Sequence, residues 1–586
     1  MSRRFDQYYQ SELAYLRDMG RAFAAAHPAI AGLLAERGAD PDVERMLEGF
    51  SFLSARIRQR IDDALPELVE PLVDALLPHY LRPTPATTMV QFTPPRGAMR
   101  GRVVLPRGSA VASKPVEGTP CQFRTTQDVD LLPISLTEQR LVDPTTSAPT
   151  LQLRFEIAKG GAPAVFHPRG LRLHLHGELA VASHLYLWLV RHLRTVEVVP
   201  LEGPSEKVTL PADVVKPAEC GADEGLFPWP RGSNDGTRRL LEFSAFPSRF
   251  LFVDVTSLDR AALLDCERFE LRFHFDRPPP LHVRLPEDVV RLHCSPVVNL
   301  FEASAEPIRG DGTARPCLLR PAGMNPFHAE VFSVDSVIGI VSRSGERRTY
   351  VPFHAFEHAL TRRPSLGYYV TMREPSPVDD GIHVSLAIGA PRDLLPRMEE
   401  ETLSVELTCT NRSLPNALRV GDVCVPTGST LAGLKFTNIG TVTRPLRPPL
   451  GSELEWRLLA HLSLGHASLA EARALKTHLH LHNFQETADQ VHGRANRRRI
   501  DGLEAIEASA SVRSVRGGPV RGLSVQLDFE EAAFGSLGEA FLFGSVLERL
   551  LGERAPISSF VATSLRLRPT NARLTWDPRN GSTTIV

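Results

Sequence analysis

The sequence predicts an α+β protein with a helical N-terminal segment, predominantly β-rich middle domains of the sandwich or barrel-like type, and a mixed α/β C-terminal region with long helices. Three observations predict this class. Apolar residues recur every three to four positions near the N-terminus, they alternate with polar residues through the middle of the chain, and helical spacing returns near residue 452. We place the domains at 1–85, 86–290, 291–430 and 431–586.

The N-terminal region contains two amphipathic patterns. The first predicted helix carries Phe5, Tyr9, Leu13, Leu16 and Phe23 along one face. The second begins at Asp40, a suitable N-cap, and Pro41, which fits the first helical position. Its apolar positions are Val43, Leu47, Phe50, Leu53, Ile57 and Ile61. The run "LPELVEPLVDALLPHYL" predicts a third, interrupted helix.

The middle of the chain alternates as half-buried strands do. Leu151, Leu153, Phe155 and Ile157 share one predicted strand, and "ERFELRFHF" shows the same period. The 48 prolines fit a loop-rich β protein. After residue 450, Trp456, Leu459 and Leu462 return to helical spacing, "SVQLDF" predicts a strand, and "LGEAFLFGSVLERLLGE" predicts a long helix.

The composition argues against several classes of protein. Lys and Arg total 67 and Asp and Glu total 68, so the chain lacks the basic excess of a dedicated nucleic-acid binder. Seven cysteines without a CxxC pair argue against a disulfide framework or a cysteine zinc site. Neither a signal peptide nor a membrane-spanning apolar run is visible. We expect a soluble protein in a reducing cytoplasm.

Motifs of known chemistry are scarce. The chain lacks a G-x-S-x-G elbow, a phosphate loop and a dinucleotide fingerprint. His478, His480 and His482 alternate, so they would share one face of a strand and could ligate zinc, whereas on a helix only His478 and His482 would be neighbours. A metal-dependent hydrolase built on this row is the alternative from the enzyme class, and a β-rich module that binds carbohydrate or peptide is a third hypothesis.

Two polar clusters need an interpretation. Arg494, Arg497, Arg498 and Arg499 could touch phosphate, but a solvated loop or a protein-contact patch fits the neutral total charge better.

The second cluster is "TCTNRSLP", at residues 408–415. Cys409 could be an activated nucleophile, because the cation of the nearby Arg412 could lower the pKa of its thiol. It also continues the alternation of Leu403, Val405 and Leu407, which predicts a buried strand residue. In that case Asn411 and Ser413 would bond their own backbone at the turn, and Arg412 would hold several carbonyls or a carboxylate. We favour this structural interpretation.

Taken in order, the motifs of the chain resemble those of the TssF family of the bacterial type VI secretion system. "CTNRSLP" resembles a family signature, and "CSPVVNLFEASAEPI" and "DPDVERMLEGFSFLSARIRQRIDDALPEL" resemble two more, as does "WRLLAHLSLGHASL". The residues that carry the resemblance, all expected to be structural, are Cys409, Thr410, Asn411, Arg412, Leu414, Pro415, Pro296, Asn299, Leu300, Phe301, Asp40, Pro41, Glu44, Arg45, Glu48, Phe52, Arg56, Trp456 and Arg457.

The resemblance implies a baseplate wedge protein without catalytic activity or cofactor. Its implied partners are TssG, with two TssF copies per TssG, then TssK, TssE, the VgrG hub and sheath proteins, with neither nucleic acid nor a small-molecule substrate. TssK would link the plate to the membrane complex, which implies a cytoplasmic location at the inner face of the inner membrane. For such a protein we expect terminal helices that join an intersubunit bundle and keep apolar stripes exposed until partners arrive.

Overall fold

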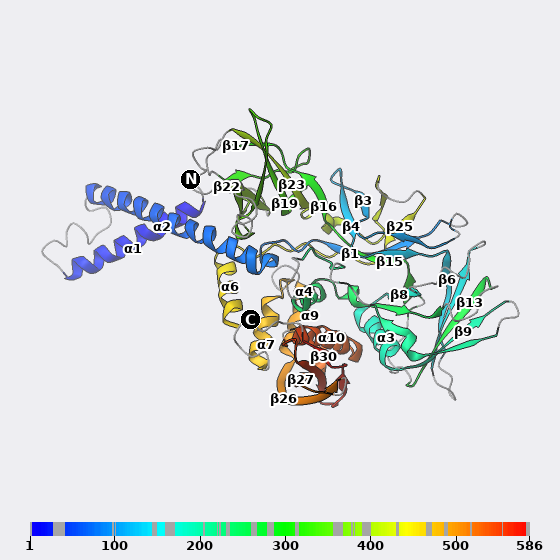
Figure 1. The fold of residues 1–586 in the computed structure, drawn as a ribbon. Helices are drawn as coiled ribbons and strands as arrows, with labels where there is room; N and C mark the ends of the chain where they lie inside the picture. The colour runs from blue at the N-terminus through cyan, green and yellow to red at the C-terminus, as the bar shows by residue number, and fades with distance from the viewer. Residues whose placement is uncertain are drawn as a thin grey trace.

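A computed structural model gives the fold (Figure 1). It describes residues 3–581 except 27–40, 96–98, 100, 143–148, 159–169, 203–205, 219–220, 222–223, 230–234, 259–265, 278–285, 287, 311–315, 356–366, 377–378, 380, 390–399, 429–432, 465–470, 486–489, 516–517 and 554.

The N-terminal helices form an arm that projects from the β-rich body (Figure 1). Helix α1 (Arg3–Ala26) and helix α2 (Pro41–Leu76) run antiparallel, because Arg17 pairs with Glu44 at 2.7 Å while Arg58 pairs with Glu12 at 2.6 Å. Leu13, Ser51 and Ala55 are buried. We call this pair of helices the helical arm.

The prediction of a third, interrupted helix is wrong. Residues 65–76 continue α2, although Pro66 and Pro71 lie inside it. A proline in a helix removes one main-chain hydrogen bond. Packing compensates at this end of α2, where Val73 and the following Leu77 and Tyr80 are buried against Leu454 and Leu458.

The central sheet combines strands from distant parts of the chain. Its order is β24-β3-β4-β15-β1-β25. The strands are β1 (Thr87–Thr93), β3 (Ala110–Val116), β4 (Thr119–Thr125), β15 (Cys294–Val298), β24 (Val423–Pro426) and β25 (Lys435–Asn438). A separate pair, β2 (Val103–Leu105) and β5 (Val129–Leu131), shares its core.

Two sheets and two helices lie beyond the central sheet. The first has the order β10-β9-β13-β7-β6 and the second β11-β12-β8-β14. Their strands are β6 (Ile134–Val142), β7 (Thr150–Ile157), β8 (Leu171–Leu175), β9 (Leu193–Pro200), β10 (Val208–Pro211), β11 (Val215–Pro217), β12 (Phe252–Val255), β13 (Arg268–Phe275) and β14 (Val290–Leu292), with α3 (Leu179–Arg191) and α4 (Asp235–Ala245). The alternation predicted for residues 151–157 is confirmed, since Leu151, Leu153, Phe155 and Ile157 are all buried.

An eight-stranded sheet is inserted between β15 and β24. Its order is β16-β23-β19-β20-β21-β22-β18, with β17 paired to β23. The strands are β16 (Phe301–Ser304), β17 (Ile308–Gly310), β18 (Cys317–Leu318), β19 (Glu330–Val341), β20 (Arg347–Pro352), β21 (Gly367–Pro375), β22 (Ile382–Gly389) and β23 (Glu401–Thr410). We call it the inserted sheet.

The C-terminal region mixes helices and strands. Its elements are α6 (Ser452–Leu464), α7 (Ala472–Leu481), α9 (Gln490–Asp501), β26 (Leu503–Val515), β27 (Gly518–Glu530), α10 (Leu537–Glu553), β28 (Phe560–Arg568), β29 (Arg573–Thr575) and β30 (Arg579–Asn580). Helix α10 packs against α3 and α4, so one hydrophobic core continues from Leu132 to Leu567. The predicted fold class is confirmed; the domain limits stay a proposal.

None of the helices in the described ranges combines the length and the apolar character that crossing a membrane requires.

A buried carboxyl joins the helical arm to the inserted sheet. Glu70 near the end of α2 is 5 % exposed and accepts a hydrogen bond of 3.1 Å from the main-chain N–H of Arg373 on β21. Burial raises the pKa of the Glu70 carboxyl from 4.5 to about 7. The folded protein therefore binds this proton more tightly than the unfolded chain does.

This shift predicts a pH-dependent stability. A carboxyl whose folded-state pKa exceeds its unfolded value contributes less stability as pH rises from about 4.5 through about 7. Glu70→Gln imitates the protonated form, so it should leave the melting temperature nearly unchanged at about pH 5. At about pH 8 it should stabilise the protein, by up to roughly 3 kcal/mol. The exposed Glu48→Gln on the same helix is the control. Equal effects of the two variants at about pH 8 would contradict the account.

Candidate functional site

The motif residues of the middle region meet where the chain passes between two sheets. After β15 the chain leaves the central sheet at Asn299 and enters the inserted sheet as β16. After β23 it leaves the inserted sheet at Asn411 and returns to the central sheet as β24. The two passages lie side by side, because Phe301 pairs with Cys409.

Asn299 and Asn411 bond each other reciprocally; we call the pair the asparagine clasp. The side-chain N–H of Asn299 donates to Oδ1 of Asn411 at 2.8 Å, and the main-chain N–H of Asn411 donates to Oδ1 of Asn299 at 2.8 Å. Both side chains also bind Gln122 on β4, whose N–H donates to Asn411 at 2.8 Å and whose carbonyl accepts from Asn299 at 2.6 Å. Both asparagines are buried, so the clasp satisfies polar groups that water does not reach.

Arg412 extends the clasp outward. Its Nη1 donates to the carbonyl of Pro326 at 2.9 Å, and its Nη2 donates to Asp379 at 2.7 Å. That hydrogen bond holds the pKa of the Asp379 carboxyl well below its usual range. The backbone of Arg412 has φ of 52°, which is uncommon for a residue with a side chain. A Cβ on Gly381 would lie 1.5 Å from Nη2, so glycine leaves the room that Arg412 fills. The predicted multiple bonding of Arg412 is confirmed.

The other motif residues of this region lie in the cores on either side of the clasp. Phe301 and Cys409 are buried in the core of the inserted sheet, Leu414 in that of the central sheet, and Leu300 beside Phe332. Pro415 is buried in a short 3-10 turn, Leu414–Ala417. Pro296 faces Met89, and Thr410 faces Glu330, across neighbouring strands.

Cys409 is unsuited to nucleophilic chemistry. Its side chain is 0 % exposed, and burial raises the pKa of its thiol to about 12. Only the thiolate is nucleophilic, so at neutral pH this thiol is protonated and shielded. The interpretation of Cys409 as a buried strand residue is confirmed.

The motif residues of the helical arm have mixed surroundings. Asp40 lies outside the described residues, and Pro41 opens α2. Glu44 bonds Arg17 across the arm, whereas Arg45 lies 3.8 Å from Asp42 within α2. The remaining three residues are exposed: Glu48, Phe52 and Arg56.

An apolar stripe runs along the exposed side of the arm. Met46, Phe50, Leu53 and Ile57 follow one another at spacings of four, three and four, which places them on one face of α2. Their exposed fractions are 75, 65, 58 and 62 %. Tyr15, Met19 and Phe23 on α1 are exposed in the same way. The periodicity predicted for Phe50, Leu53 and Ile57 is correct, but the described part of the chain leaves these side chains exposed.

Helix α6 shows a smaller exposed apolar face. Trp456 is 71 % exposed, with Leu459 and Leu462 nearby on the same helix. The side chain of its neighbour Arg457 instead contacts residues of this chain. It donates a hydrogen bond to the carbonyl of Leu481 at 2.9 Å, and its guanidinium lies 5.2 Å from the ring centre of Phe484.

The histidine row does not form one ligand set. Its residues lie at the end of helix α7 rather than on a strand. His480 turns away and approaches Asp501 at 3.0 Å. His478 and His482 are buried with ring centres 4.6 Å apart, near His461 and His79. Within the ranges that the structure describes, no cluster of three His, Cys, Asp or Glu side chains is arranged to hold a metal ion.

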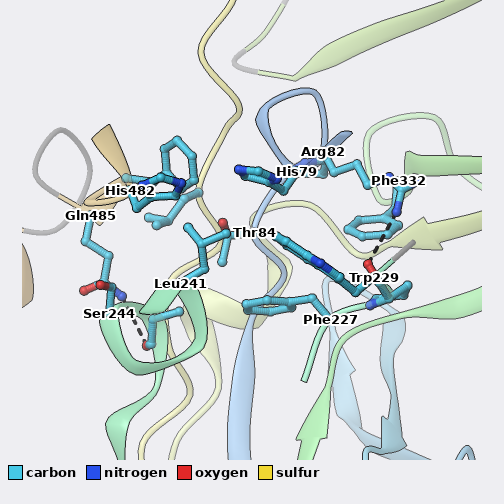
Figure 2. Close-up of a pocket in the computed structure, with 15 residues that line it drawn as sticks. His79, Arg82, Thr84, Phe227, Trp229, Leu241, Ser244, Phe332, His482 and Gln485 are labelled. Carbon is cyan, nitrogen blue, oxygen red and sulfur yellow. Dashed lines mark hydrogen bonds between the residues drawn. The ribbon is translucent and has the colours of Figure 1, made fainter. Parts of the chain in front are cut away.

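An apolar pocket lies beside these histidines, where the chain leaves the arm (Figure 2). Figure 2 shows His79, Phe227, Trp229, Leu241 and Phe332 around it. His79 stacks on Trp229 with ring centres 4.8 Å apart, and burial holds its pKa well below the usual value. No sequence motif predicts this pocket, because six separate segments of the chain line it, between His79 and Gln485.

The predicted arginine cluster is divided among different partners. Arg499 bonds the buried Glu539 at 2.5 Å and Arg498 bonds the carbonyl of Ala532, whereas Arg497 lies 3.5 Å from Asp501. These arginines on α9 thus fix the C-terminal region rather than converging on one anion.

From the asparagine clasp we predict that one substitution lowers the stability of the protein strongly. Asn411→Ala should lower the free energy of unfolding by roughly 2–4 kcal/mol, because the main-chain N–H of Gln122 and one side-chain N–H of the buried Asn299 lose their acceptor. Urea unfolding measures the change. Asn416→Ala, five residues along and exposed, is the matched control and should stay within about 0.5 kcal/mol. If the two variants unfold alike, the clasp does not hold the sheets together.

Comparisons with known proteins agree with this geometry. Residues 1–583 match the family model described as "Type VI secretion system, TssF". The chain is 29 % identical over 630 aligned residues to type VI secretion system component TssF1 of Pseudomonas aeruginosa, with 99 % of each chain covered. Its fold is similar, at a TM-score of 0.79 and 30 % identity, to a chain in a cryo-electron microscopy structure of a type VI secretion TssK-TssF-TssG baseplate subcomplex, covering 91 % of this chain and 98 % of that one. A second likeness, at a TM-score of 0.61 and 26 % identity, is to a chain of the type VI secretion baseplate complex and covers 99 % and 100 %. The protein therefore belongs to the TssF family of type VI secretion system components.

Proposed function

We propose that this protein is a wedge subunit of a type VI secretion baseplate, which binds a TssG-like protein at two copies per TssG. TssK, TssE, the VgrG hub and sheath proteins complete the set of partners. The wedge lies in the cytoplasm and reaches the inner face of the inner membrane through the contact of TssK with the membrane complex. The protein acts by holding partners in place, without catalysis or cofactor.

The observation that carries this proposal is the apolar stripe of the helical arm. Each of its large side chains gains about 1.5–3 kcal/mol when it is fully buried, so a stripe left open to water is a strong site for association. Four side chains in line on α2, at spacings of three and four residues, suit insertion between the helices of a partner. The stripe lies on the arm that projects from the body (Figure 1).

The arm is firmly joined to the body at its other end. Glu70 bonds the inserted sheet, and Val73 packs with Tyr80, Leu454 and Leu458. A partner held on the stripe would therefore have a fixed position relative to the sheets. This is the mechanical property that a wedge subunit requires.

The solved relatives support the choice of partners. In one of them a TssF chain, to which this chain is 30 % identical, stands in a subcomplex with TssG and TssK. The alternative of a metal-dependent hydrolase built on the histidine row has less support, because His480 lies apart from His478 and His482 on α7.

Charges placed in the stripe test the proposal. Leu53→Asp combined with Ile57→Asp should weaken binding to the TssG-like partner by at least roughly two orders of magnitude, since the complex would bury two unpaired carboxylates. The measurement is co-purification after co-expression, followed by the mass of the complex from light scattering. The unmodified chain should give two copies per partner.

The control is Gln10→Asp, which adds an acid to an exposed position of α1 outside the stripe. It should bind as the unmodified chain does, and all variants should melt alike. If the double variant still co-purifies at two copies per partner, the arm is not the site of assembly.

A further inference from the structure

The outer edge of β26 is a long strand edge without a neighbour among the described strands. The C-terminal sheet has the order β26-β27-β28-β29, so β26 lies at its border. This strand has 13 residues, about twice the usual length, and its only register shift lies at its start, between Leu503 and Ala505. Within the described part of the chain, the main chain of residues 506–514 bonds only β27.

Such an edge is a template for another strand. A soluble monomer normally protects a long edge with charged side chains, above all lysine, with proline or with a bulge. Residues 506–514, "IEASASVRS", have no proline, bulge or lysine, and their charged side chains are Glu507 and Arg513, one near each end. The small side chains of Ala508, Ser509, Ala510 and Ser511 leave the edge open to close approach.

The outward hydrogen-bonding residues follow from the pairing with β27. Pro519 on β27 faces Ser514 and has no N–H, so these two residues cannot form a pair that exchanges two main-chain hydrogen bonds. Ser514 and Pro519 are therefore a non-hydrogen-bonded pair, and every second residue of β26 from Ser514 back is in the same position. The N–H and C=O groups of Ala508, Ala510 and Val512 therefore point away from β27.

We propose that this edge pairs with the same edge of a second copy of this chain, antiparallel and centred on Ala510. In that register Ala510 faces its own equivalent, and Ala508 faces Val512 of the other copy, so that the outward groups of both strands bond each other. The pairing rests on the proposed function, in which two copies of this chain meet in one assembly, and it assigns a surface to their contact.

Charge complementarity selects a second copy as the occupant. The same register places Glu507 of each copy opposite Arg513 of the other, which gives two opposite-charge pairs across the two-fold axis. Arg513 is exposed, and the Glu507 side chain is 68 % exposed and lies 3.8 Å from Arg566. A register shifted by two residues would lose both pairs.

Exposed apolar side chains lie on the other face of this edge. Val512 is 66 % exposed and Leu523, which faces Ala510 on β27, is 46 % exposed. Pairing would bring two copies of each into one continuous sheet of β27-β26-β26-β27. The second copy would then cover side chains that this chain leaves in water.

A cysteine placed at the axis tests the register. In the proposed pair the two Cα atoms of residue 510 lie about 5.5 Å apart, within disulfide range. Ala510→Cys should therefore form a covalent dimer under mild oxidation. Ala508→Cys is the matched control, because its two copies would lie roughly 13 Å apart along the strands. Both variants are made in the full chain, alone and co-expressed with the TssG-like partner, and compared with the unmodified chain.

Charge reversal gives a second test. Glu507→Arg or Arg513→Glu alone should raise the dissociation constant of the dimer roughly tenfold, and the two changes together should restore it. Ultracentrifugation of the full chain measures this constant.

The outcomes separate this inference from the proposed function. A two-to-one complex in which Ala510→Cys links no better than Ala508→Cys would overturn the β26 pairing and leave the wedge standing, and it would assign the edge to another occupant. Selective linkage at Ala510 without a complex would support the pairing and overturn the wedge. A double charge reversal that binds no better than the single variants would also overturn the pairing.

Discussion

The reciprocal hydrogen bonds of Asn299 and Asn411 are the constraint on which the arrangement of the sheets depends. The inserted sheet, from β16 to β23, is joined to the central sheet through two chain passages, and the clasp binds these passages to each other and to Gln122. Each asparagine supplies both a donor and an acceptor, so replacing either would leave several buried groups unsatisfied. Arg412 adds a charged bond to Asp379 at the rim.

The helical arm can position a partner only if it is held in place relative to the sheets. An exposed apolar stripe is a weakness in a lone chain and an advantage in an assembly, provided that the arm keeps its position. Glu70 and the cluster of Val73, Tyr80, Leu454 and Leu458 hold the base of the arm, while Phe50, Leu53 and Ile57 stay in water. The molecule thus combines a fixed body with an exposed apolar surface on the arm.

The sequence predicted local features well where one short segment decides them. The alternation of Leu403, Val405, Leu407 and Cys409 correctly predicted a strand with a buried cysteine, because period two depends only on neighbours. The helix through Pro66 and Pro71 was missed, since distant packing outweighs the local cost of proline.

Contacts between residues far apart in the chain could not be predicted from the sequence. Asn411 was expected to bond its own turn, yet its side chain bonds residues 112 and 289 positions away. The histidine row stayed ambiguous between strand and helix until α7 separated His480 from the other two. Helical periodicity identified the apolar face of α2, but periodicity cannot tell a side chain buried in its own chain from one reserved for another subunit.

Hydrogen exchange of α1 and α2, with and without a co-expressed TssG-like partner, tests the central claim most directly. The account predicts that the main chain around Phe50, Leu53 and Ile57 exchanges faster in the lone chain and becomes strongly protected in the complex. The strands that flank the asparagine clasp should be protected equally in both. Unchanged exchange along the arm in a complex that has demonstrably formed would contradict the claim.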